Sequence, residues 1–141
     1  VVVVDESHLL DKDMFEEIRF LLNYKMDSEN PLALILVGQT ELWNKLKTQA
    51  YRAVMHRVDI KCFLQPYDLS QTKAYILAQL DYSGFKGSIF SDDAMKLIYD
   101  FSSGVPRLIN NACTNSLIYA YQNRRTIIDD KMVQQVIDGE T

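Results

Sequence analysis

The sequence has few of the residues that mark special classes of protein. Its 141 residues include two cysteines, five glycines and three prolines. They contain no apolar run near the roughly 20 residues that span a bilayer. These scarcities exclude disulfide-rich and collagen-like proteins. Because Cys62 and Cys113 lie far apart and outside any metal-site spacing, we predict that both are reduced thiols in a cytosolic chain.

Positive charge is also scarce. Fifteen Lys and Arg against nineteen Asp and Glu give a net charge of −4, which argues against a surface that binds nucleic acid over its whole extent. Two local clusters remain as candidates for a DNA contact, Arg124 with Arg125 and Lys45 with Lys47, although a solvated loop and a solvated helix face explain them better. The 48% apolar and 24% charged residues predict an ordinary globular fold.

The first half of the chain alternates strand and helix patterns. Apolar runs at 1–4 and 32–37 predict strands of a parallel sheet, the first one buried on both faces. Between them, apolar residues at helical spacing over 15–22 predict a helix, and 27–31 predict a turn. Alternating apolar residues at 58–64 predict a third strand. This order predicts an α/β fold with a partial parallel sheet of about three strands.

The pattern changes after Pro66. Four amphipathic helices are predicted, and no strand pattern of similar quality returns; the helices cover 69–82, 92–101, 105–121 and 129–138. A run of helices without strands is typical of a separate bundle. We therefore predict two domains, an α/β part at 1–66 and an all-helical part at 67–141.

Two acids, Asp5 and Glu6, follow directly on the first predicted strand. In an open α/β sheet, ligands bind beyond the carboxyl ends of the strands, so these side chains fall in the expected site. One carboxylate can hold Mg²⁺ through its water shell, and the other can polarise an attacking water as a general base. The competing interpretation is that the pair only stabilises the positive end of the following helix.

Two further polar residues lie near strand ends. Gln39 comes just after the second predicted strand, where its amide can orient a water or contact a phosphate, or only close a local turn. Arg57, with Arg52 and His56 nearby, precedes the third predicted strand. A guanidinium there can stabilise charge on the phosphoryl group of a nucleotide bound by a neighbouring subunit, although exposed arginines are common.

The helical half carries one comparable motif, Gly104-Val105-Pro106-Arg107. Pro106 suits the first turn of a helix, and Ser102 or Ser103 is predicted as its cap. A cation at a helix start is unfavourable for the helix dipole. An anionic ligand would therefore explain Arg107 better than helix stability does, and a solvated arginine is the alternative.

The order of these features resembles that of AAA+ ATPases. In particular, residues 1–10, 15–23, 34–42 and 104–111 resemble the ExeA-like and TniB-like family, bacterial ATPases of general secretion and of DNA transposition. The resemblance extends over nearly the whole chain. It implies a P-loop-type sheet followed by an all-helical AAA+ lid, and a protein that couples ATP binding and hydrolysis to the assembly of a secretion or transposition complex.

The resemblance also implies roles for individual residues. Asp5 and Glu6 match the Walker B pair, with Asp5 holding Mg²⁺ through water and Glu6 catalytic. Gln39 matches the sensor-1 position, where Asn, Ser or Thr is commoner among AAA+ proteins. Arg57 matches the catalytic arginine finger, with Arg52 as the alternative, and Arg107 matches the nucleotide-binding sensor-2 arginine.

The implied ligands and partners follow from the same family. ATP and Mg²⁺ are the expected cofactors of the full-length protein. Its expected partners are further copies of itself in a ring or filament, and either a secretion-complex protein or a transposase with DNA. A cytoplasmic location is expected, peripheral at the inner membrane in the full-length protein if it serves secretion.

One family element is missing from these residues. No GxxxxGK[ST] occurs in the sequence, so no phosphate-binding loop can be built. In the family this loop precedes the Walker B strand, and the chain opens on that strand without a Met. We therefore expect a fragment that does not hydrolyse ATP alone.

Two other functional classes compete with this interpretation. Residues 5–8 also resemble the DExH signature of helicases, but Gly38-Gln39-Thr40 does not fit the motif that follows in those proteins. On this view His8 is a polar residue in the turn after the strand. The other class is an oligomerisation or partner-docking module without catalytic role.

Overall fold

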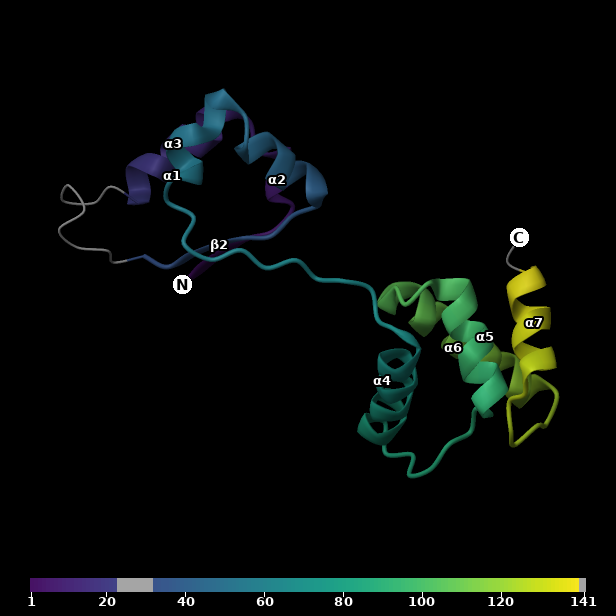
Figure 1. Cartoon of the computed structure of the whole chain (residues 1–141). Coiled ribbons are helices and arrows are strands. Elements are labelled where there is room, and N and C mark those ends of the chain that lie inside the picture. Colours follow the sequence, from purple (N-terminus) through teal and green to yellow (C-terminus); the bar gives the residue numbers. More distant parts are fainter. Residues whose placement is uncertain (23–31, 140–141) are drawn as a thin grey trace. The chain divides into compact units, whose positions relative to one another are not determined.

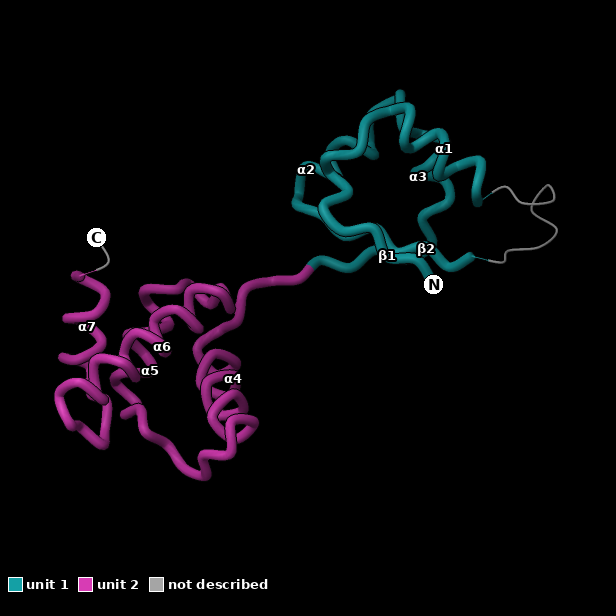
Figure 2. The backbone as a smooth tube through the Cα atoms, turned by 180° about the vertical axis from the view of Figure 1, so that it is seen from behind, with its two compact units in different colours: residues 1–63 teal, residues 64–141 magenta. Residues whose placement is uncertain are grey.

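The computed structural model describes residues 1–22 and 32–139, so the turn predicted at 27–31 lies outside the described residues. The chain divides into two compact units, Val1–Phe63 and Leu64–Thr141, drawn in different colours in Figure 2. Within the described ranges, no helix combines the length and the apolar character needed to cross a membrane.

The first unit contains a small parallel sheet. Strand β1 (Val2–Val4) pairs with β2 (Leu34–Leu36), with Val2 opposite Leu34 and Val4 opposite Leu36. The prediction that the first two strands belong to a parallel sheet is therefore confirmed, and the structure shows that they are neighbours. The pairing continues past the strands, because the Val37 N–H donates to the Val4 carbonyl oxygen at 2.9 Å.

Three helices lie on one side of the two strands in Figure 1: α1 (Lys12–Leu22), α2 (Thr40–Leu46) and α3 (Arg52–Met55). Two 3₁₀ turns, η1 (Ser7–Leu9) and η3 (Gln49–Tyr51), connect them to the neighbouring elements. The core of the unit is made of side chains from these helices, namely Phe15, Leu42, Leu46 and Val54.

The expected burial of the first strand on both faces was wrong. Val1 is 87% exposed, Val3 59% and Ile35 49%, whereas Leu36 packs against the core cluster. The reason is that successive side chains of a strand point to opposite faces and only one face is covered by the helices of this unit. An apolar sheet face is left exposed within the unit.

The predicted third strand was also wrong. Residues 58–64 form no strand within the described part of the chain, although their side chains alternate. A strand requires a hydrogen-bonded neighbour, and among residues 1–22 and 32–139 the sheet contains β1 and β2 alone. Side-chain contacts hold part of this segment instead. The Lys61 Nζ lies 4.3 Å from the centre of the Trp43 ring, and the Phe63 ring packs edge-on against the same indole, with the ring centres 6.0 Å apart.

The second unit is helical. Its four helices are α4 (Leu69–Tyr82), α5 (Asp92–Ser102), α6 (Pro106–Gln122) and α7 (Asp130–Gly139). They occupy the four ranges that the apolar periodicity predicts. Fully buried branched side chains from α5, α6, α7 and the segment before α7 form the centre of the core: Ile98, Ile109, Ile128 and Val133.

A close backbone contact joins the start of this unit to the loop before α6. The Tyr67 N–H donates to the Gly104 carbonyl oxygen at 2.9 Å, and Gly104 has φ +75°. The serine cap predicted for α6 was wrong, because its N-cap is Val105, without a side-chain hydrogen bond. Ser102 is instead the last residue of α5, and its buried hydroxyl accepts from the Gly104 N–H at 3.3 Å.

The two cysteines are expected to react very differently with alkylating reagents. Burial raises the pKa of the Cys113 thiol on α6 to about 12, whereas Cys62 is exposed. At about pH 8.5 almost no thiolate forms at a site with so high a pKa, so iodoacetamide should label Cys62 first. Peptide mass spectrometry checks this order. Equal labelling of both cysteines in the folded chain would contradict it, and denaturant should abolish the difference.

Candidate functional site at the carboxyl end of the sheet

The chain turns sharply at the two acids that follow β1. The Asp5 carboxylate accepts a hydrogen bond from the Glu6 N–H at 2.8 Å, and Glu6 adopts left-handed backbone angles, with φ 52° and ψ 31°. Few residues other than glycine adopt this conformation, and such strained positions cluster at functional sites. Both carboxylates are exposed, so this turn presents two acids to solvent beyond the end of the strand.

The parallel pairing brings Gln39 to the same end of the sheet. Ser7 N–H donates to the Val37 carbonyl oxygen at 2.8 Å, which holds the loop after β2 against the turn after β1. Gln39 is the N-cap residue of α2, but its side chain makes no capping hydrogen bond. The Gln39 backbone does close the first turn of this helix, because its carbonyl oxygen accepts from the Leu42 N–H at 3.0 Å, and the side chain takes no part in that bond.

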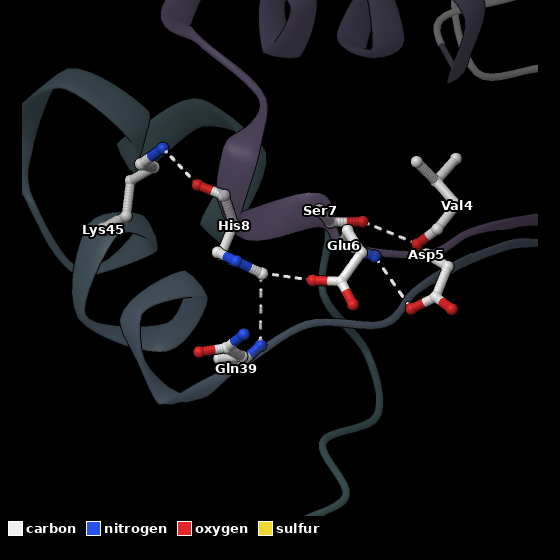
Figure 3. A network of polar contacts seen from close by, with 7 residues as sticks. All are labelled: Val4, Asp5, Glu6, Ser7, His8, Gln39 and Lys45. Atoms are coloured by element: carbon white, nitrogen blue, oxygen red, sulfur yellow. Dashed lines mark hydrogen bonds and ion pairs between the residues drawn. The ribbon is translucent and has the colours of Figure 1, made fainter.

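The imidazole of His8 lies between Glu6 and Gln39 (Figure 3). Its Nδ1 atom is 3.4 Å from the Glu6 Oε2 atom and 3.4 Å from the Gln39 backbone nitrogen. The His8 side chain is 14% exposed, compared with 61% for Glu6. From the sequence, His8 was expected to be a turn residue. Its contact with Gln39 could not be foreseen, because the two residues are 31 apart along the chain and meet only when the strands pair.

The turn that carries His8 is held from several sides. The buried Ser7 hydroxyl donates to the Val4 carbonyl oxygen at 2.6 Å. From α2, the Lys45 ammonium donates to the carbonyl oxygens of His8 at 2.6 Å and Leu10 at 2.9 Å. These bonds engage two of the three N–H groups of an ammonium that the sequence offered as a candidate for a DNA contact, so Lys45 holds this turn.

Gly38 allows the two loops to approach each other. A Cβ atom at this position would lie 3.2 Å from the His8 backbone nitrogen and 3.1 Å from the Leu42 Cδ2 atom. A side chain at residue 38 would therefore press on the turn that carries the acids.

The two arginines of the predicted site lie on other elements. Arg57 is half-buried in the turn after α3, where its backbone N–H donates to the Val54 carbonyl oxygen at 3.0 Å. Arg52, the alternative, is the exposed first residue of α3. Arg107 is exposed in the first turn of α6, in the second unit.

The donor set at the turn suits magnesium better than a metal held by protein ligands alone. No group of three or more His, Cys, Asp and Glu side chains that could hold a metal occurs within residues 1–22 and 32–139. Magnesium often keeps several waters and binds one or two carboxylates together with substrate phosphates. The exposed Asp5 carboxylate after β1 fits that mode of binding.

Comparison with known proteins shows which family the chain belongs to. Residues 1–46 match the family model described as an AAA domain. The chain is 33% identical over 121 residues to General secretion pathway protein A of Aeromonas hydrophila, an alignment that covers 86% of this chain and 22% of that protein. The chain thus spans about a fifth of the length of this curated relative.

Solved structures show the same fold. A mutant RuvB of Thermotoga maritima matches with a TM-score of 0.75 and 19% identity, covering 97% of this chain and 43% of that one. Another structure, described as the Thermotoga maritima RuvB Holliday junction branch migration motor, matches with a TM-score of 0.73 and 20% identity over the same shares. The fold is that of an AAA+ protein. Together with the sequence match to the secretion protein, this means that the chain belongs to the ExeA-like AAA+ proteins.

Proposed function

We propose that these residues supply the carboxylates and sensors of an ATPase whose phosphate-binding loop lies outside them. The observation that carries the proposal is the pairing of β1 with β2, which places Asp5, Glu6 and Gln39 at one end of the sheet. Ligands of parallel α/β sheets bind at this end. In this proposal the full-length protein consists of these residues together with the phosphate-binding loop that precedes them in the family.

The chemistry assigned to the site is hydrolysis of ATP. Glu6 accepts a proton from the attacking water. The oxygen of that water forms a bond to the γ-phosphorus, while the bond between this phosphorus and the ADP oxygen breaks. Bound Mg²⁺, held by Asp5 through water, would neutralise charge on the phosphates. Gln39 orients the water or contacts the γ-phosphate from the neighbouring strand.

The arginines complete the proposal. Arg57, with Arg52 as the alternative, acts on a nucleotide bound by an adjacent subunit, which requires an oligomer, either a ring or a filament. Arg107 contacts the nucleotide from the helical unit, which serves as the lid. In these terms residues 1–66 are the second part of the nucleotide-binding domain and residues 67–141 are the lid domain.

Between the two cellular roles, we favour secretion. The relative with 33% identity is named a general secretion pathway protein. Of the two basic clusters, one is engaged within the chain: Lys45 is bonded by backbone carbonyls, and the Lys47 ammonium lies 5.0 Å from the centre of the Trp43 ring. In the other cluster, Arg124 and Arg125 are exposed. The protein would thus couple ATP turnover to the assembly of a secretion complex rather than of a transposition complex.

Calorimetric titration with ATP and Mg²⁺ tests the division of labour. We expect no binding in the micromolar range by the 141-residue chain, because most of the affinity for the phosphates comes from a loop that it lacks. The full-length protein should bind ATP and release phosphate. Micromolar binding by the 141-residue chain would contradict the proposed division, and a full-length protein without ATP turnover would contradict the proposed function.

A further inference from the structure

The contacts of His8 extend the proposed function, on which the following inference rests. A single ring nitrogen, Nδ1, lies 3.4 Å from both the Glu6 Oε2 atom and the Gln39 backbone nitrogen. The Gln39 N–H is a donor and the Glu6 carboxylate is an acceptor. Nδ1 can accept from the first only while it carries no hydrogen, and it can donate to the second only while it carries one. The two contacts are therefore mutually exclusive.

Both arrangements are open to a neutral imidazole. A ring with its hydrogen on Nε2 accepts from the Gln39 N–H and makes no bond to the Glu6 carboxylate, which is then hydrated and not positioned. A ring with its hydrogen on Nδ1 binds Glu6 and gives up Gln39. The exchange changes the bonding of Glu6 without changing the net charge of the ring.

The surroundings of His8 make the ring a stable support. Its backbone carbonyl is held by the Lys45 ammonium at 2.6 Å, and the preceding Ser7 is buried and bonded to Val4. The Glu6 backbone is bonded to Asp5 and Leu9, but the Glu6 side chain lacks such support, because it is 61% exposed. Figure 3 shows the imidazole extending from the held turn toward both partners.

We propose that His8 is the positioning residue of Glu6, which it tethers or releases according to whether its Nδ1 atom bonds the Glu6 carboxylate or the Gln39 N–H. The backbone of Gln39 thereby becomes coupled to the freedom of the proposed general base. A shift of Gln39 toward a ligand frees Nδ1 for Glu6, and the return of Gln39 releases the carboxylate.

Two amide substitutions separate this role from a merely structural one. His8→Asn places an amide atom near the position of Nδ1, whereas His8→Gln places it near Nε2. In the full-length protein we expect His8→Ala and His8→Gln to lower kcat by about 10- to 100-fold with little change in the KM for ATP. His8→Asn should restore most of the lost kcat. Unchanged turnover in His8→Ala, equal losses in the Asn and Gln variants, or a common fall in melting temperature that accounts for the losses would overturn the proposal.

Nuclear magnetic resonance on the 141-residue chain tests the coupling without turnover. With ¹⁵N-labelled histidine, and with His56→Ala to simplify the spectrum, the His8 Nδ1 resonance should move in Glu6→Gln. In a uniformly ¹⁵N-labelled chain, the Gln39 backbone amide resonance should move in His8→Asn and more in His8→Ala. Absence of both responses would refute the coupling. If both occur and the wild-type full-length protein has no ATPase activity, the proposed function fails while the contact of His8 with its two partners stands.

Discussion

Gly104→Ala is expected to destabilise the helical unit by about 4 kcal/mol or more, which is in the exceptional range for a single substitution. A Cβ atom at this position would lie 1.8 Å from the Tyr67 carbonyl oxygen, and the backbone has φ +75°. The left-handed conformation alone disfavours alanine by roughly 1–2 kcal/mol. Relief of the overlap would require the backbone of residue 67 to move, which breaks the bond from the Tyr67 N–H to the Gly104 carbonyl oxygen.

Urea unfolding followed by circular dichroism measures this loss, and Gly84→Ala is the matched control. Gly84 also has positive φ, +89°, but nothing lies within 4 Å of its added Cβ atom. The control should therefore lose only the conformational part, roughly 1–2 kcal/mol. Equal losses in the two variants would show that the contact with Tyr67 has no energetic weight.

Gly104 lies three residues before Arg107, the proposed sensor, in the loop that leads into α6. The glycine of the Gly-Val-Pro-Arg motif is thus required by the approach of a distant backbone segment. Sequence alone indicated the helix start from Pro106 but could not indicate this approach. The partner, Tyr67, is 37 residues away along the chain and carries no pattern of its own.

The helices were the most predictable part of the fold. The start of α4 is fixed by local chemistry: the Asp68 carboxylate accepts from the Gln71 N–H at 2.7 Å, and the Gln71 side chain accepts from the Asp68 N–H at 3.0 Å. Such a reciprocal cap depends on residues three apart, so it can be read directly from the sequence. The short helix α3 (Arg52–Met55) and the 3₁₀ turn η3 have no comparable signal and were not predicted, whereas a turn was expected where η1 forms.

Strands were less predictable because they depend on partners. Residues 1–4 are a continuous apolar run, and residues 58–64 alternate apolar side chains with the charged Asp59 and Lys61. Both patterns predict a strand, but among the described residues only the first segment lies beside another strand. Periodicity reports which side chains share a face and says nothing of where the backbone N–H groups find acceptors. For the same reason the exposure of Val1 and Val3 could not be read from their apolar character.

The candidate site was predictable in part. The position of Asp5 and Glu6 after an apolar run, and of Gln39 after the next one, follows from the rule that parallel strands present their carboxyl ends to one edge. The contributions of His8 and Lys45 were missed, since each makes its contact across more than 30 residues of sequence. A histidine after an acid pair and a lysine on a helix have too many ordinary uses to indicate these contacts.

Glu6→Gln in the full-length protein should lower the rate of ATP hydrolysis by about 100-fold or more while ATP binding is retained. The amide has nearly the same shape as the carboxylate and can still accept a hydrogen bond from His8, but it cannot take a proton from the attacking water. Steady-state phosphate release measures kcat, and calorimetric titration measures the affinity for ATP. The combination of lost turnover and retained binding is what distinguishes a general base from a residue that binds the nucleotide.

Glu17→Gln is the matched control for this substitution. Glu17 lies on α1, is exposed as Glu6 is, and undergoes the same loss of one negative charge, so its variant should keep the turnover of the unmodified protein. A general electrostatic effect would lower both rates alike, whereas proton acceptance at the turn after β1 lowers only one. If Glu6→Gln turned over ATP as fast as Glu17→Gln, Glu6 would not be the general base. If the unmodified full-length protein turned over no ATP at all, the oligomerisation or partner-docking module would be the better account of these residues, because a scaffold without catalytic role hydrolyses no nucleotide.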